Sequence, residues 1–123
     1  MLLLKTKHSF DSAHYLPDPY VGKCRRMHGH TYHLEIVWKP ICHLDDVGMS
    51  VDFSSIKKVV EDYLTEYDHH VLNETCPTPT AEVLVQQIAE ELGNFIDNSD
   101  LLLRIQGITL WETESCAAVW ERD

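Results

Sequence analysis

The sequence predicts an α+β domain in which a four-stranded antiparallel sheet carries two helices on one face, in the order ββααββ. Two β-rich segments come first, two segments with apolar residues at helical spacing follow, and two further β-rich segments end the chain. With 123 residues and 44% hydrophobic content, the chain can bury one core. A single domain over residues 1–123 is therefore expected.

The predicted strands lie in the first and last thirds of the chain. Residues 2–12 mix apolar and polar side chains and are short on turn residues, which suits a strand. Residues 31–39 are rich in β-branched and aromatic side chains, alternate roughly by two and end at Pro40. Residues 101–111 and 115–120 have the same character. Because a sheet this small has two open edges, we expect the chain to form a homo-oligomer.

Two helices are predicted between these strands, each behind a residue that can cap it. Asp52 precedes the first helix and Thr80 the second, whose first turn also carries Glu82. The apolar side of the first is expected to comprise Phe53, Ile56, Val59, Val60, Tyr63 and Leu64. That of the second is expected to comprise Leu84, Ile88, Leu92, Phe95 and Ile96.

The charge balance and the N-terminus exclude several classes of protein. Ten Lys and Arg stand against 20 Asp and Glu, and a net charge of −10 argues against nucleic-acid binding. The apolar run at residues 2–4 is far too short for a signal peptide or membrane span, so we expect a cytoplasmic protein without membrane contact. Four scattered cysteines without a CxxC pair are then expected to be free thiols.

Three histidines form a candidate metal site. His28 and His30 flank Gly29 at the entrance to the second strand, and the period of two points both imidazoles to one face. His14 follows the first strand, so it converges on the same point if the two strands pair as a hairpin. Three imidazoles with an open fourth position are typical of catalytic zinc. The alternative is that they are surface or hydrogen-bonded core histidines.

Cys24 and the cations around it form a second candidate group. Its neighbours Lys23, Arg25 and Arg26 favour a thiolate that acts as base or nucleophile. Alternatively, Cys24 is a fourth zinc ligand or an inert thiol. The same cations are candidates for binding an anionic, phosphorylated substrate, although a solvated loop is the commoner role of such a charge run.

Two acidic positions complete the candidates. Asp68 precedes His69 and His70, and an adjacent carboxylate can orient an imidazole for proton transfer. Adjacent residues need not touch, so this signal is weak alone. Glu112 is an ordinary exposed acid unless a pocket forms beside it.

Taken together, six segments resemble the 6-pyruvoyl and 6-carboxytetrahydropterin synthase family from end to end. Their order and intervals make the resemblance specific, although Ser12 stands where alanine is usual. The segments are Phe10 to Leu16, Cys24 to His30, Gly48 to Phe53, Asp68 to Asn73, Pro79 to Glu82 and Trp111 to Thr113.

The resemblance implies a tunnelling fold that assembles as a hexamer, a dimer of trimers with sites between subunits. It implies zinc held by His14, His28 and His30, Cys24 as catalytic base, and Asp68 with His69 as the pair that relays protons. His70 competes with His69 for that role. Glu112 would grip the pterin ring, and Thr80 would help to shape its pocket.

The expected substrate is 7,8-dihydroneopterin triphosphate. Three residues separate Cys24 from His28, which resembles the bacterial 6-carboxytetrahydropterin synthases of queuosine biosynthesis, lyases that release acetaldehyde and triphosphate. The alternatives are the pyruvoyl activity or an aldolase-like variant on the same scaffold, a non-catalytic pterin- or zinc-binding relative, and a structural zinc module.

Overall fold

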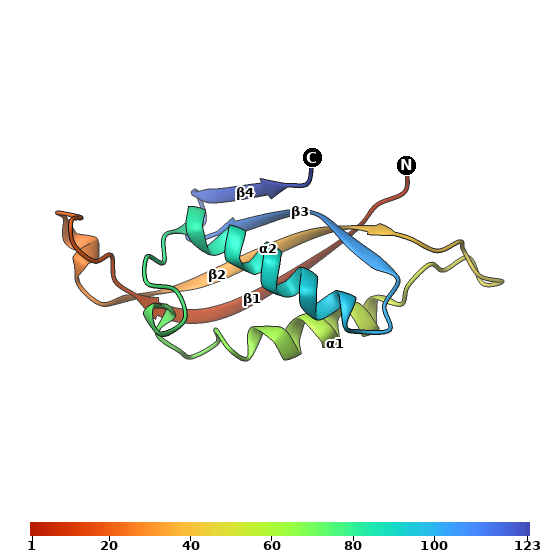
Figure 1. The fold of residues 1–123 in the computed structure, drawn as a ribbon, viewed down its shortest axis with the longest axis horizontal. Coiled ribbons are helices and arrows are strands. Elements are labelled where there is room, and N and C mark those ends of the chain that lie inside the picture. The colour runs from red at the N-terminus through yellow and green to blue at the C-terminus, as the bar shows by residue number, and fades with distance from the viewer.

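The computed structural model describes residues 1–123 and confirms the predicted architecture, a four-stranded sheet with two helices on one face (Figure 1). The strands lie in the order β1-β2-β3-β4, and every neighbouring pair is antiparallel. The strands are β1 (Leu4–His14), β2 (His28–Pro40), β3 (Leu103–Trp111) and β4 (Ala117–Glu121). The helices are α1 (Phe53–Leu64) and α2 (Ala81–Asp97), with short 3-10 turns at Lys23–Arg25 and Leu72–Glu74.

The core lies between the helices and one face of the sheet. Alternate residues of β2 from Tyr32 to Trp38 are buried, and so is Phe10 of β1, whose ring stacks on Tyr32 with centroids 5.0 Å apart. Helix α1 packs on β1, while α2 packs on β3 and β4. The period of two in the strands therefore decides which side chains face the helices and which face away.

Both predicted helix caps are present. The Asp52 side chain accepts the backbone N–H of Ser54, and the Thr80 hydroxyl accepts that of Val83. The prediction of the apolar faces is wrong at two residues, however, because the side chains of Phe53 and Phe95 are 50% and 41% exposed. Phe53 is the first residue of α1, and Phe95 lies at the margin of the buried stripe of α2.

The first two strands extend beyond the predicted limits. His14 was expected to follow its strand, but it is the last residue of β1, and β2 already begins at His28. The imidazoles interrupt the hydrophobic alternation without interrupting the backbone pairing, in which His14 lies opposite His28. The histidines are therefore held by a regular hairpin ladder.

The structure contains no disulfide. Cys76 is buried, Cys24 and Cys42 are partly buried, and Cys116 is exposed, and all four are free thiols as predicted. No helix combines the length and apolar composition that a membrane span requires. A cluster of 21 buried hydrophobic residues holds the helices on the sheet.

A hydrogen-bonded chain links the core to the β1 edge. The indole N–H of Trp38 donates to the Thr6 hydroxyl at 2.9 Å, and this hydroxyl lies 2.7 Å from Nε2 of His8. Burial, with the charge of Lys57 as a second cause, lowers the pKa of His8 to about 4. Neutral His8 is therefore the form that the folded protein favours.

This arrangement predicts that His8 contributes to acid sensitivity. Because its pKa in the folded state lies below the ordinary 6.5, its contribution to stability is complete above pH 6.5 and is lost as the pH falls toward 4. Moving from neutral to acidic buffer lowers the Tm of both proteins in their metal-free forms. We expect this drop to be about 3 °C smaller in the His8→Gln variant than in the wild type. Thermal unfolding followed by circular dichroism would measure this.

The exposed His43 supplies a matched control. His43→Gln is expected to keep the wild-type difference between the two buffers. An equal loss of Tm in wild type and His8→Gln would contradict the assignment.

Candidate metal centre and active site

Three imidazoles meet at one end of the sheet. His14 closes β1, His28 opens β2 directly opposite, and His30 lies two residues further on the same face of β2. One nitrogen from each ring lies within 4.8 Å of the others. The ring centroids are 4.5 to 5.1 Å apart. The predicted convergence of these residues is confirmed, and the cluster can hold a metal ion.

Backbone carbonyls orient two of the rings. Nδ1 of His14 donates to the carbonyl of Pro79 at 2.8 Å, and Nδ1 of His28 donates to that of Arg26 at 2.7 Å. These bonds leave Nε2 of each ring with a free lone pair, as metal ligation requires.

Nε2 of His14 is the observation that tests the fit to a metal. It is buried without a hydrogen-bond partner, which is costly for a polar atom unless a ligand satisfies it. Burial is the largest influence that lowers the pKa of His14, and likewise that of His30. Neutral imidazoles offer their lone pairs without competition from protons, so this donor set fits a divalent ion.

Glu112 lies beside the histidines, immediately after β3. Its Oε1 is 3.4 Å from Nε2 of His14 and 3.7 Å from Nε2 of His30. Its side chain is 28% exposed, so it can also reach a molecule in the adjoining cavity. A pocket does form beside this carboxylate, which is the condition that the sequence left open.

One cavity joins most of the predicted site residues. Its volume is about 750 Å³, large enough for a small-molecule substrate. The three histidines, Cys24, Lys23, Thr80 and Glu112 line it together with Leu16, Tyr20, Ala81, Glu82 and Thr113. Sequence reasoning did not assign five of these lining residues to the site, namely Leu16, Tyr20, Ala81, Glu82 and Thr113. Tyr20 was missed because a tyrosine between prolines and a glycine carries no metal or acid-base signature. The only signal was its place four residues before Cys24.

The basic residues around Cys24 do not share one environment. Lys23 lines the cavity, whereas Nη2 of Arg25 pairs with Oδ1 of Asp18 at 2.7 Å. Arg26 is exposed, and its carbonyl holds His28. Lys23 is therefore the member of this cluster that faces the cavity.

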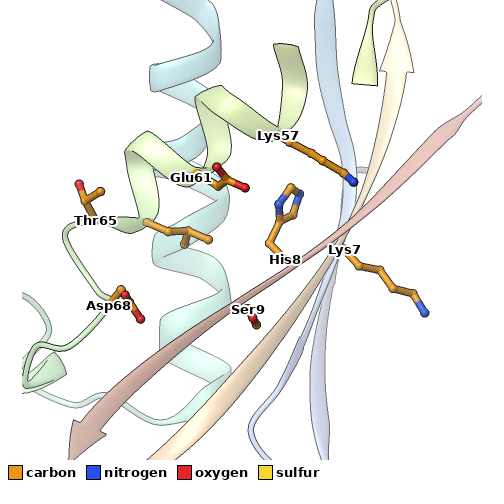
Figure 2. Close-up of a pocket in the computed structure, with 8 residues that line it drawn as sticks. Lys7, His8, Ser9, Lys57, Glu61, Thr65 and Asp68 are labelled. Carbon is orange, nitrogen blue, oxygen red and sulfur yellow. The ribbon is translucent and has the colours of Figure 1, made fainter. Parts of the chain in front are cut away.

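Asp68 and His69 lie outside this cavity. Figure 2 shows Asp68 in a separate pocket between β1 and α1, with Lys7, His8, Ser9, Lys57, Glu61 and Thr65. His69 lines a third hollow with residues of β1 and β2, including Asp11 and Gly29. A single chain therefore does not bring the Asp68 and His69 pair to Cys24.

The pair itself is well formed. Oδ2 of Asp68 accepts Nδ1–H of His69 at 2.9 Å, and Oδ1 accepts the backbone N–H of Asp11 at 2.8 Å. The bond from Asp11 is the largest cause that lowers the pKa of Asp68, while the bond to Asp68 raises the pKa of His69. His70 instead faces Glu74 at 3.9 Å, so His69 is the imidazole that has the aspartate partner.

The geometry thus defines a class, a small α+β domain with a three-histidine cluster that can hold a metal ion, set in a substrate-sized cavity. The profile of the family described as 6-pyruvoyl tetrahydropterin synthase matches residues 3–123, so the chain belongs to that family. The resemblance seen in the sequence is confirmed.

Individual relatives agree with this membership. The 6-carboxy-5,6,7,8-tetrahydropterin synthase of Bacillus subtilis is 32% identical over 91% of this chain and 72% of its own length. The enzyme of the same name from Haemophilus influenzae is 31% identical over 92% of this chain and 94% of its own length. A dihydroneopterin monophosphate aldolase of Pyrococcus furiosus is 31% identical over 85% of this chain and 83% of its own length. The structure of Caenorhabditis elegans 6-pyruvoyl tetrahydropterin synthase superposes with a TM-score of 0.79 at 23% identity and covers 99% of this chain and 96% of its own. This similarity confirms the tunnelling fold.

The histidine cluster predicts a defined metal stoichiometry. Incubated with zinc and dialysed, the protein is expected to retain about one ion per chain, and saturation at a hundredfold excess over Kd should stabilise it by about 2.7 kcal/mol. Replacing His14, His28 or His30 by Ala is expected to abolish retention, because two imidazoles remain. Elemental analysis by mass spectrometry would measure the content.

His33 is the matched control. It lies on β2 with His28 and His30, but its side chain is exposed on the opposite face of the strand. His33→Ala is expected to keep the full metal content. Retention by all three site variants would contradict the assignment.

Proposed function

We propose that this protein is a zinc-dependent lyase, 6-carboxytetrahydropterin synthase. It would convert 7,8-dihydroneopterin triphosphate to 6-carboxy-5,6,7,8-tetrahydropterin, releasing acetaldehyde and triphosphate, in queuosine biosynthesis. The observation that carries the proposal is the cavity in which Cys24, Glu112 and the three histidines meet. The names of the relatives from Bacillus subtilis and Haemophilus influenzae, which cover nearly all of this chain, support it.

Zinc is the metal that best suits this donor set. Three neutral imidazoles are a common zinc ligand set and leave a coordination position open. When bound, zinc would supply Lewis-acid polarisation of the substrate's side-chain oxygens. Cys24 is partly buried in the same cavity and would take the proton from carbon.

Glu112 and Thr80, which line the same cavity as the histidines, would bind the pterin. The Glu112 carboxylate can accept two hydrogen bonds from the guanidine-like edge of the ring, and Thr80 lies nearby at the start of α2. Lys23 lines the cavity and is our first choice for the triphosphate, and Arg25 and Arg26 of the same loop are the further candidates.

Asp68 and His69 would complete the site of a neighbouring subunit. The outer edges of β1 and β4 are the two ends of the sheet. The β1 edge is covered by residues 69–71 at Asp11 and Ala13, and the edges that stay open favour pairing with another copy. We propose the hexamer of two trimers that the family resemblance implies. The free thiols are consistent with the reducing cytoplasm, where we place the protein.

Two other products are possible on this scaffold. The family description and the Caenorhabditis elegans structure name the pyruvoyl activity, and the Pyrococcus furiosus relative is named an aldolase acting on a monophosphate. The short spacing from Cys24 to His28 favours the carboxy product, since it resembles the bacterial enzymes.

Product analysis tests the proposal directly. The zinc-loaded protein is incubated with 7,8-dihydroneopterin triphosphate, and in parallel with the monophosphate, and the products are identified by mass spectrometry. We expect 6-carboxytetrahydropterin and acetaldehyde from the triphosphate, and at least a hundredfold loss of kcat in Cys24→Ala, the typical cost of removing a general base. A pyruvoyl product, or turnover of the monophosphate alone, would replace the proposal with the corresponding alternative.

A shared site predicts complementation between two inactive variants. Cys24→Ala and His69→Ala are each expected to be inactive. When they are unfolded together and refolded as an equal mixture, about a quarter of the sites would combine an intact Cys24 with an intact His69 from the next subunit. We expect about a quarter of wild-type activity in the mixture, measured by the same product assay.

The control mixture joins Cys24→Ala with His14→Ala, whose residues lie in one cavity of one chain. Mixed assembly cannot restore an intact site in this mixture, because Cys24 and His14 of a site come from the same chain and every chain lacks one of them. Activity in the control, or none in the test mixture, would contradict a site shared between subunits.

A further inference from the structure

Tyr20 occupies a defined place beside Cys24 in the cavity. Both residues line it, and both belong to the loop that joins β1 to β2. The two ends of this loop are held together, since the backbone N–H of Leu16 donates to the carbonyl of Cys24 at 2.8 Å. Asp18 and Arg25 form an ion pair across the same loop at 2.7 Å.

Gly22 leaves the space that the Tyr20 ring occupies. A Cβ atom built at position 22 would lie 2.7 Å from the Tyr20 hydroxyl oxygen, 2.9 Å from Cζ and 3.0 Å from Cε1. The ring therefore packs directly against the Gly22 backbone. The φ of Gly22 is 168°, extended backbone that any residue adopts, so the space and not the conformation requires glycine.

This packing directs the phenol at the thiol. The Tyr20 hydroxyl and the Cys24 thiol line the same cavity, and the neighbouring Cys24 side chain is the largest cause that raises the pKa of Tyr20. Tyr20 is 39% exposed, so neither the core nor the fold explains its position. The phenol keeps its proton and is available as a donor to sulfur.

We propose that Tyr20 is a positioning residue that donates a hydrogen bond to the Cys24 sulfur and holds it toward the substrate carbon. The inference rests on the proposed function, in which Cys24 is the base. In the step it assists, the substrate C–H bond breaks, an S–H bond forms on Cys24, and the electron pair stays on the substrate. Tyr20 gains and loses nothing, because its O–H stabilises the thiolate before the transfer.

Two variants remove this interaction in different ways. Tyr20→Phe deletes the hydroxyl and keeps the ring. Gly22→Ala keeps the hydroxyl but displaces it, because the new Cβ would take its place. Tyr15→Phe is the matched control, since Tyr15 is the first residue of the same loop and does not line the cavity.

The expected result is the same for both variants. Each should lower kcat about tenfold with less than a twofold change in KM, and each should raise by roughly 0.5 to 1 pH unit the midpoint of the pH profile for alkylation of Cys24 by iodoacetamide. Tyr15→Phe should match the wild type in both measurements. Zinc content and Tm, compared with the wild type, verify that each variant is folded and metal-loaded.

The alkylation profile depends on Cys24 and not on turnover, so it separates the two proposals. The other ionisable groups that face the cavity stay unchanged in Tyr20→Phe, namely His14, Lys23, His28, His30, Glu82 and Glu112. If the wild-type protein shows no turnover, the proposed function is refuted and the role of Tyr20 is still decided by the alkylation profile. A wild-type profile in either variant overturns the role of Tyr20, and so does a rise in KM with unchanged kcat, which would make Tyr20 a substrate contact.

Discussion

The pairing of His14 with His28 across the first hairpin is the constraint on which the site depends. Alternate residues of β1 and β2 face the helices, so Phe10 and Tyr32 of the core are followed on the same face by the histidines. A slip of one residue in β2 would turn His28 and His30 to the opposite face and expose its buried residues at the same time. The free energy of burying the core therefore also fixes the register of the histidine cluster.

Helix α2 couples this hairpin to a distant part of the chain. The carbonyl of Pro79, just before the helix, accepts the Nδ1 proton of His14 at 2.8 Å, and the hydroxyl of Thr80 caps the helix. Since α2 packs on β3 and β4, docking of the helix sets the tautomer of a histidine on β1. His14 and Pro79 are 65 residues apart in the chain, so packing between distant segments orients this imidazole.

Patterns with a strict period were predictable from the sequence, and contacts within loops were not. The alternation in β2 and the His-Gly-His spacing predicted the strand and the common face of the two imidazoles. The position of Tyr20 depends on a close approach to Gly22 and on a bond between Leu16 and Cys24, neither of which has a periodic signature. Helical spacing also placed Phe95 inside, because periodicity marks a stripe without marking where its margin meets solvent.

A strained backbone conformation at His69 positions the separate Asp68 and His69 pair. His69 has a φ of 61°, in the left-handed region, and such a conformation in a residue other than glycine costs roughly 1–3 kcal/mol. The backbone hydrogen bond from His69 to Asp11 and the side-chain bond to Asp68 maintain it, yet the His69 ring is 77% exposed and adds little to the core. Strain held at an exposed imidazole gives the fold no stability of its own. The segment that carries it hydrogen-bonds to β1 at Asp11 and Ala13, so the Asp68 and His69 pair lies on a covered stretch of the sheet edge with its imidazole toward solvent. If the proposed shared site forms, a second subunit would meet this pair beside β1, and the same strand would serve two sites, its own through His14 and the neighbour's through the pair.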